Sequence, residues 1–174
     1  EIGDGIEGHG YQGRLVESLR QVMLGPRYDY ASATLTIPIV GHITGASDQL
    51  HIAESAAATV LSSEFATPLV SRFAEIGLAL MAVLQGDFDA PKELYVRLKS
   101  AAGSYLRISG DRVLGLLAQA MGEQEQAALH FQEGYAFCLK SGYRPELAWT
   151  CYNHASLLHR CEMGEGAKAA ALLE

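Results

Sequence analysis

The sequence predicts an all-α protein built as a stack of antiparallel helical hairpins, and three observations support this prediction. The 174 residues include 18 glycines and only 5 prolines, a balance that favours helices joined by glycine-containing turns over a turn-dense β-sandwich. Apolar residues recur at helical spacing. Ala53, Ala90 and Ala127 each stand near the start of an expected helix, 37 residues apart. A period of this length is typical of stacked hairpins, because each pair buries its apolar face against the next.

The expected organisation is a glycine-rich lead-in, 1–13, followed by a single helical-repeat domain, 14–174, truncated at both ends. Glycine is too frequent in 1–13 for a regular helix. The chain starts at Glu1, and 168–174 stop inside a helix-forming pattern without a cap. About nine helices are expected, over 14–24, 28–43, 47–61, 67–84, 89–102, 112–121, 124–140, 145–160 and from 166 onward.

Glycine and proline delimit the helices in the first half of the chain. Gly25 and Pro26 should end the first helix, and Pro38 should distort the second. Thr67 should cap the helix at 67–84, and Gly86 should end it. The apolar face expected for 47–61 comprises Leu50, Ala53, Ala57, Val60 and Leu61.

The second half follows the same rules, and no strand is expected in it. Asp111 should cap the helix at 112–121, while Gly122 and Gly142 should end two successive helices. The expected apolar stripes are Leu94, Leu98, Ala101 and Ala102; then Ala127, Phe131, Tyr135 and Cys138; then Leu147, Ala148, Cys151, Tyr152, Ala155 and Leu158.

This pattern resembles the tetratricopeptide repeat. In that family a small residue in the first helix lets its partner approach, a small residue opens the second helix, and an aromatic residue follows four positions later. The unit that matches best supplies Leu114, Gly115, Gly122, Ala127 and Phe131. In the preceding unit Gly77, Ala90 and Leu94 are offset by one residue, and the usual tryptophan near the repeat start is missing. The resemblance implies a right-handed tetratricopeptide-like α-solenoid.

Residues 112–161 resemble, more specifically, the carboxy-terminal repeat region of large bacterial signalling ATPases, the cyclase-linked or LuxR-type regulators. The resemblance implies a non-catalytic protein-interaction or regulatory scaffold within a larger signalling or transcription-regulating ATPase. The chain itself contains no GxxxxGK[ST] loop, cyclase carboxylate pattern or basic recognition helix. Those activities are therefore expected in other modules of the parent protein.

In resembling proteins the first helices of successive pairs line a concave groove, which implies a set of partner-binding residues here. Arginine offers bidentate donors, and tryptophan and tyrosine offer broad apolar area. For Trp149 and Tyr152, packing between hairpins is the alternative. The expected partner is a protein or peptide, including other domains of the parent chain, and a homodimer remains open. The candidate groove residues are Arg112, Leu116, Gln119, Trp149, Tyr152 and Asn153.

A second function class also remains open: a small-molecule effector-sensing repeat domain. This alternative resembles the inducer-binding repeat domain of the maltose-regulon activator. A closed apolar pocket with converging polar groups would favour the sensor, and an open groove would favour the scaffold.

Charge and composition exclude several other classes. The net charge is -7, and the 13 Lys and Arg residues are scattered, so direct binding of nucleic acid is not expected. Three cysteines do not suggest a secreted disulfide framework, and a cytoplasmic protein is expected. Charged residues interrupt every long apolar run, so no membrane span is expected.

No catalytic residue, cofactor or metal is expected either, and hence no enzyme. The best metal candidate in the sequence is the group Cys151, His154, His159 and Cys161. Helical geometry separates these residues, because His159 should point away from the first two and Cys161 lies about 15 Å along the axis from Cys151.

Overall fold

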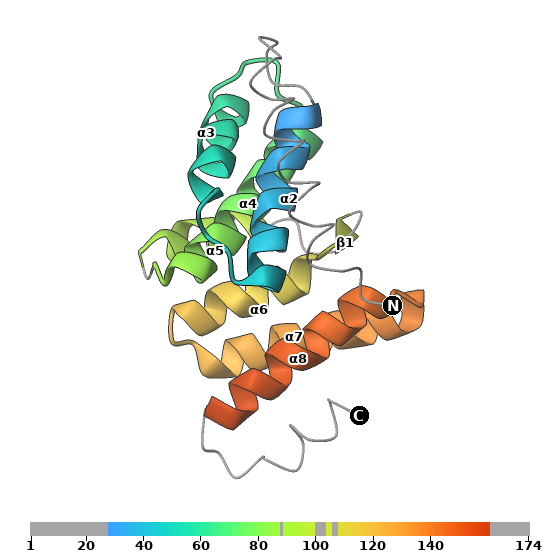
Figure 1. Ribbon diagram of the computed structural model, residues 1–174. Coiled ribbons are helices and arrows are strands. Elements are labelled where there is room, and N and C mark those ends of the chain that lie inside the picture. The colour runs from blue at the N-terminus through green and yellow to red at the C-terminus, as the bar shows by residue number, and fades with distance from the viewer. Residues whose placement is uncertain (1–27, 88, 100–103, 106–107, 161–174) are drawn as a thin grey trace. The chain divides into compact units, whose positions relative to one another are not determined.

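The computed structural model describes residues 28–87, 89–99, 104–105 and 108–160. These residues form seven α-helices and one short pair of strands, which confirms the all-α class (Figure 1). The helices expected at 14–24 and from 166 onward lie outside the described residues. The chain divides into two compact units, Glu1–Gly86 and Asp87–Glu174. Repeat stacking and a single domain over 14–174 stay predictions.

The first unit contains three mutually packed helices, α2 (Tyr28–Thr44), α3 (Leu50–Leu61) and α4 (Pro68–Gln85) (Figure 1). The side chains that fill the space between them are small or aliphatic, which allows close helix packing. One buried cluster comprises Ala33, Ile37, Leu50, Ala53 and Met81, and a second comprises Ala57, Val60 and Ala74.

Thr34 of α2 and Gly77 of α4 lie very close together. A Cβ atom at position 77 would lie 2.0 Å from the Thr34 carbonyl oxygen. Pro38, which lies inside α2, has no N–H to donate to that carbonyl four residues earlier. The two nearest atoms, the Thr34 carbonyl oxygen and carbon, belong to the backbone of α2. This backbone is what requires glycine at position 77.

The limits of α4 confirm its predicted capping signals, whereas the start of α3 differs from the prediction. The Thr67 hydroxyl accepts a hydrogen bond from the Val70 N–H at 3.4 Å, and Gly86 ends α4 with a φ of 66°. However, α3 begins at Leu50 and not at residue 47, because 47–49 form a turn closed by a hydrogen bond from Leu50 N–H to the Ser47 carbonyl. Leu61, expected to face a neighbour, is 36% exposed.

One helix of the first unit, α4, has the length and apolar composition to cross a bilayer. In this structure 44% of α4 is buried, and the helix packs against α2 and α3, as in the core helix of a helical bundle. Length and composition alone are weak evidence for a span, and both the cytoplasmic location and the lack of a membrane association stay predictions.

The second unit contains α5 (Ala90–Lys99), α6 (Gly110–Ala120), α7 (Gln124–Ser141) and α8 (Arg144–Arg160), in which α6 contacts each of the other three helices (Figure 1). The expectation of no strand was wrong for a minimal antiparallel pair, β1 (Ser104–Tyr105) and β2 (Ile108–Ser109). Two-residue strands are too short to produce a period in the sequence.

Ser109, and not Asp111, is the residue that caps α6. The Ser109 hydroxyl accepts a hydrogen bond from the Arg112 N–H at 3.3 Å, whereas Asp111 lies in the first turn of the helix. Both residue types are good N-caps. The sequence did not distinguish them, because β2 runs directly into α6 and shifts the start of the helix.

The α6–α7 hairpin shows the close fit that the tetratricopeptide pattern predicts. A Cβ atom at position 115 would lie 2.5 Å from Cε1 of Phe131, whose side chain is fully buried. The predicted stripes were only partly right, because Tyr135 is 37% and Tyr152 is 52% exposed. The buried face of α8 is instead largely polar, and it contains Glu146, Thr150, Asn153, His154, Ala155, Leu157 and Leu158.

Candidate functional site

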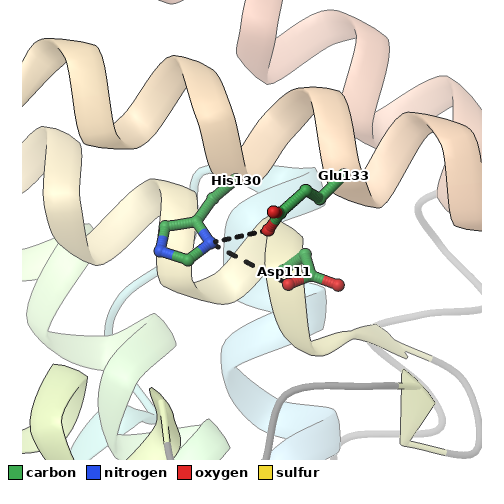
Figure 2. A group of neighbouring side chains, drawn as sticks. All are labelled: Asp111, His130 and Glu133. Carbon is green, nitrogen blue, oxygen red and sulfur yellow. Dashed lines mark ion pairs between the residues drawn. The ribbon is translucent and has the colours of Figure 1, made fainter.

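Asp111 of α6 and His130 and Glu133 of α7 bring an imidazole and two carboxylates together (Figure 2). His130 and Glu133 are three residues apart and so share one face of α7. Asp111 joins them because the first turn of α6 packs beside this part of α7. His130 Nδ1 lies 3.5 Å from Glu133 Oε2 and 3.8 Å from Asp111 Oδ1. This group of three is called the Asp–His–Glu cluster below.

The cluster is buried on one side and open to solvent on the other. The His130 side chain is 7% exposed and that of Asp111 is 14% exposed, whereas that of Glu133 is 64% exposed. The second ring nitrogen of His130, Nε2, is hydrogen-bonded to the Tyr95 hydroxyl at 2.8 Å. Gln126 Nε2 lies 3.3 Å from the same nitrogen. The imidazole is therefore held in place from α5 and α7.

The Nδ1 atom of His130 is buried and makes no hydrogen bond to any described residue. Its distances to both carboxylates exceed the roughly 3.2 Å of an ordinary N–H···O hydrogen bond. One imidazole nitrogen and two carboxylate oxygens, all atom types that bind metals, thus lie around a common point. Among the described residues, this is the one such group whose ligand atoms all lie within 4.8 Å of one another.

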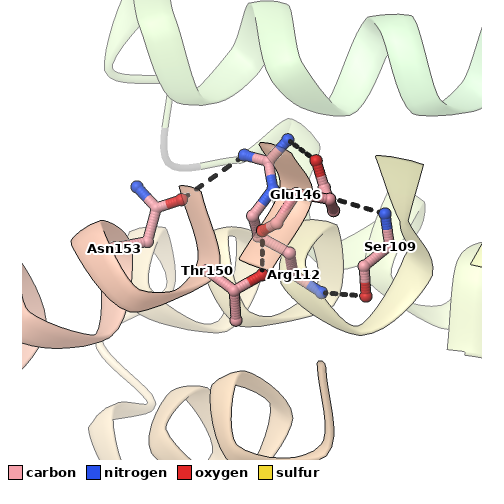
Figure 3. Close-up of polar contacts among 5 residues, drawn as sticks. All are labelled: Ser109, Arg112, Glu146, Thr150 and Asn153. Carbon is pink, nitrogen blue, oxygen red and sulfur yellow. Dashed lines mark hydrogen bonds and ion pairs between the residues drawn. The ribbon is translucent and has the colours of Figure 1, made fainter. Parts of the chain in front are cut away.

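Two of the predicted groove residues, Arg112 and Asn153, belong to a buried polar network (Figure 3). Arg112 Nε donates to Glu146 Oε1 at 2.6 Å, and the Ser109 N–H donates to the same oxygen at 2.7 Å. Arg112 Nη1 donates to Asn153 Oδ1 at 3.4 Å. The network joins the start of α6 to α8.

This network accounts for the polar face of α8. A buried charge is tolerated only when it is paired and hydrogen-bonded, and Glu146 satisfies both conditions through Arg112 and Ser109. The Thr150 hydroxyl donates to the Glu146 carbonyl at 2.8 Å. In this structure the Arg112 guanidinium is thus directed at residues of its own chain, and it is 4% exposed.

The remaining predicted groove residues do not share one exposed surface. Leu116 is buried, and Gln119 and Trp149 are partly buried. Tyr152 is the most exposed of the six, at 52%. Its ring meets that of Trp149 edge to face, with centroids 5.9 Å apart and an interplanar angle of 89°. This aromatic pair, both members on α8, is the part of the predicted groove that keeps accessible apolar surface.

The cysteine and histidines of α8 differ in burial, and Cys151 is partly buried. His154 is buried with its ring 5.9 Å from that of Phe131, and His159 is exposed. Cys161 lies outside the described residues. Burial raises the pKa of the Cys138 thiol, with Glu146 adding to the effect, and burial also raises the pKa of Cys151. Both thiols are therefore held in their neutral, less nucleophilic form.

The sequence contained part of the signal for the Asp–His–Glu cluster. A histidine and a glutamate three positions apart on an expected helix could have been noted as a pair of ligands on one face. Asp111 could not have been assigned to them, since its place depends on how α6 packs against α7.

No protein-family model matches this chain, and comparison with curated proteins and with solved structures gives no significant match either.

Proposed function

We propose that this chain is a non-catalytic protein-interaction or regulatory scaffold within a larger signalling ATPase. The exposed aromatic surface of α8 supports the proposal most directly. Tyr152 is half exposed although it belongs to a well-packed helix. Tyrosine and tryptophan are enriched among residues that contribute most to protein interfaces, because they supply apolar area at small entropic cost.

The local packing of α6 and α7 is consistent with this role. The fit of Phe131 against Gly115 has the form that the tetratricopeptide resemblance implies. Domains of that type bind peptides in grooves lined by the first helix of each pair, and α8 follows α7 as the first helix of the next pair would. The proposed ligand is a peptide segment, from a partner or from another module of the parent protein, that packs on Trp149 and Tyr152.

Selection of peptides against the whole immobilised chain tests this function. Enriched peptides should bind with micromolar affinity, and Tyr152→Ala should weaken binding by about tenfold, the loss expected when one interface aromatic residue is truncated. Leu129→Ala is the matched control, since Leu129 is a similarly exposed apolar residue, 53% exposed, on α7. Failure to enrich any peptide, or equal binding by both variants, would contradict the assignment.

Native mass spectrometry distinguishes the sensor from the scaffold. The scaffold should give the mass of the chain with no organic small molecule bound. A small molecule that is retained in the native spectrum and lost on denaturation would instead favour the effector-sensing alternative.

A further inference from the structure

We propose that Asp111, His130 and Glu133 bind a divalent metal ion such as Mn²⁺ or Zn²⁺. The three side chains offer one imidazole nitrogen and two carboxylate groups from two helices (Figure 2). This combination of ligands suits both ions. The site is independent of the peptide-binding surface proposed for α8.

The orientation of His130 is the observation that points to a cation. The imidazole is almost completely buried, and Nδ1 faces two carboxylate groups without forming a hydrogen bond to either. Nε2 has two neighbours, the Tyr95 hydroxyl and the side-chain amide of Gln126. With the amide turned so that its oxygen faces the ring, Nε2 carries the proton and donates it to the Tyr95 hydroxyl. In that tautomer Nδ1 presents a lone pair to the two carboxylates. A metal ion at their common point would turn this repulsive arrangement into coordination.

The distances leave room for such an ion. A metal with bonds of about 2.1 Å in a tetrahedral arrangement separates its ligand atoms by about 3.4 Å. The observed separations from Nδ1 are 3.5 Å to Glu133 and 3.8 Å to Asp111. The Glu133 side chain is 64% exposed, so it can rotate to close the remaining gap. Water can complete the coordination on the same exposed side.

Tyr95 acts as a positioning residue for the proposed site. Metal-binding histidines usually donate the N–H of the other ring nitrogen to an oxygen, which fixes the tautomer and the ring orientation. The Tyr95 hydroxyl lies 2.8 Å from Nε2, and its ring meets the imidazole at 68° with centroids 5.6 Å apart. Through this contact α5 helps to hold Nδ1 toward the carboxylates.

Titration of the whole, chelator-treated chain with Mn²⁺ tests the proposal, with free Mn²⁺ followed by electron paramagnetic resonance. Mn²⁺ is the better probe because, unlike Zn²⁺, it has little affinity for the thiols of this chain. One saturable site per chain is expected. Glu133→Gln and Asp111→Asn should each weaken it at least about tenfold, and Tyr95→Phe by about tenfold or more, as for other residues that orient a ligand.

Glu125→Gln is the matched control, because Glu125 is an exposed glutamate of the same helix and its replacement removes the same charge. Its affinity should equal that of the unmodified chain. Glu133→Gln alters an exposed side chain and should leave the helical circular dichroism unchanged, which separates lost binding from lost folding. Absence of saturable binding below about millimolar Mn²⁺, or equal affinities for Glu133→Gln and Glu125→Gln, would overturn the proposal.

A second measurement identifies the ligand atom. In a chain labelled with ¹⁵N-histidine, Zn²⁺ should move the Nδ1 resonance of His130 and leave Nε2 with its proton. A protonated Nδ1 that persists at saturating Zn²⁺ would exclude coordination through this atom and would mean that a proton occupies the place proposed for the metal.

Discussion

Gly115 and Phe131 are packed so closely that an alanine methyl at position 115 would lie 2.5 Å from the edge of the aromatic ring. Real Cβ atoms do not approach other heavy atoms this closely, so either the ring or α7 would have to move. The Phe131 side chain is fully buried. The separation of α6 and α7 therefore depends on this glycine.

Gly115→Ala should lower the free energy of unfolding by about 1–3 kcal/mol, the usual range for overpacking. Alanine favours a helix interior over glycine by about 1 kcal/mol, so a loss would show that the contact outweighs the helix propensity. Urea denaturation followed by circular dichroism measures the change.

Gly134→Ala on α7 is the control for this substitution. Its nearest heavy atom would be the Ser109 hydroxyl oxygen at 3.2 Å, a contact that a small side-chain shift can relieve. The loss should be smaller than for Gly115→Ala. The reverse order would show that Phe131 is not what requires a glycine at position 115.

Single and double substitutions of the ion-paired residues Arg112 and Glu146 should lower the free energy of unfolding by different amounts. Glu146→Leu leaves the Arg112 guanidinium buried without its partner, which should cost about 3–5 kcal/mol. Adding Arg112→Met removes the unpaired charge and should recover most of this loss. A double-mutant cycle from urea denaturation gives the coupling free energy, and a coupling near zero would show that the pair does not hold α6 against α8.

The raised pKa of Cys138 predicts a loss of stability in alkali. Because burial raises the pKa of this thiol above its value in the unfolded chain, the folded state holds the proton more tightly. The contribution of the protonated Cys138 thiol to stability is complete below the pKa of the unfolded chain, near 8.5. It is lost as the pH rises through the higher pKa of the folded state.

Stability measured under reducing conditions should therefore fall as the pH rises above about 8.5, and less steeply in Cys138→Ala. One proton accounts for up to about 1.4 kcal/mol per pH unit. Cys151 and other groups titrate in both chains, so the comparison isolates Cys138. Parallel pH profiles for the two chains would contradict the prediction.

Helix positions and ends could be predicted well because their signals are local. Thr67, Gly86 and Gly142 act where the sequence placed them, since a hydroxyl cap and a left-handed glycine need only their own turn of helix. The fit between Gly115 and Phe131 was also accessible through the repeat pattern. Each of these signals lies within one hairpin.

The buried face of α8 and the Asp–His–Glu cluster could not be predicted in the same way. An apolar stripe selected Ala148 and Tyr152, but the structure buries Glu146 and Asn153, whose burial depends on Arg112 of another helix. Likewise, Asp111 reaches His130 only through the packing of α6 on α7. A polar residue is buried only when a partner on another helix pairs with it. The hydrophobic periodicity of one helix carries no information about that partner.

Gly77 should be less tolerant of substitution than any helix-ending glycine. Its added Cβ would lie 2.0 Å from the Thr34 carbonyl oxygen and 2.6 Å from the carbonyl carbon, and backbone atoms cannot rotate away as a side chain can. Gly77→Ala should therefore separate α2 from α4 and cost about 3 kcal/mol or more, at or above the upper end for overpacking.

Gly86→Ala provides the comparison, because its Cβ would meet nothing within 4 Å and the strain comes only from a φ of 66°. That substitution should cost about 1–2 kcal/mol. Urea denaturation of both variants, read by circular dichroism, gives the two losses. If Gly86→Ala were the more damaging, α2 and α4 would not be in the close contact at Thr34 that the structure shows, since a methyl group could then be accommodated between them.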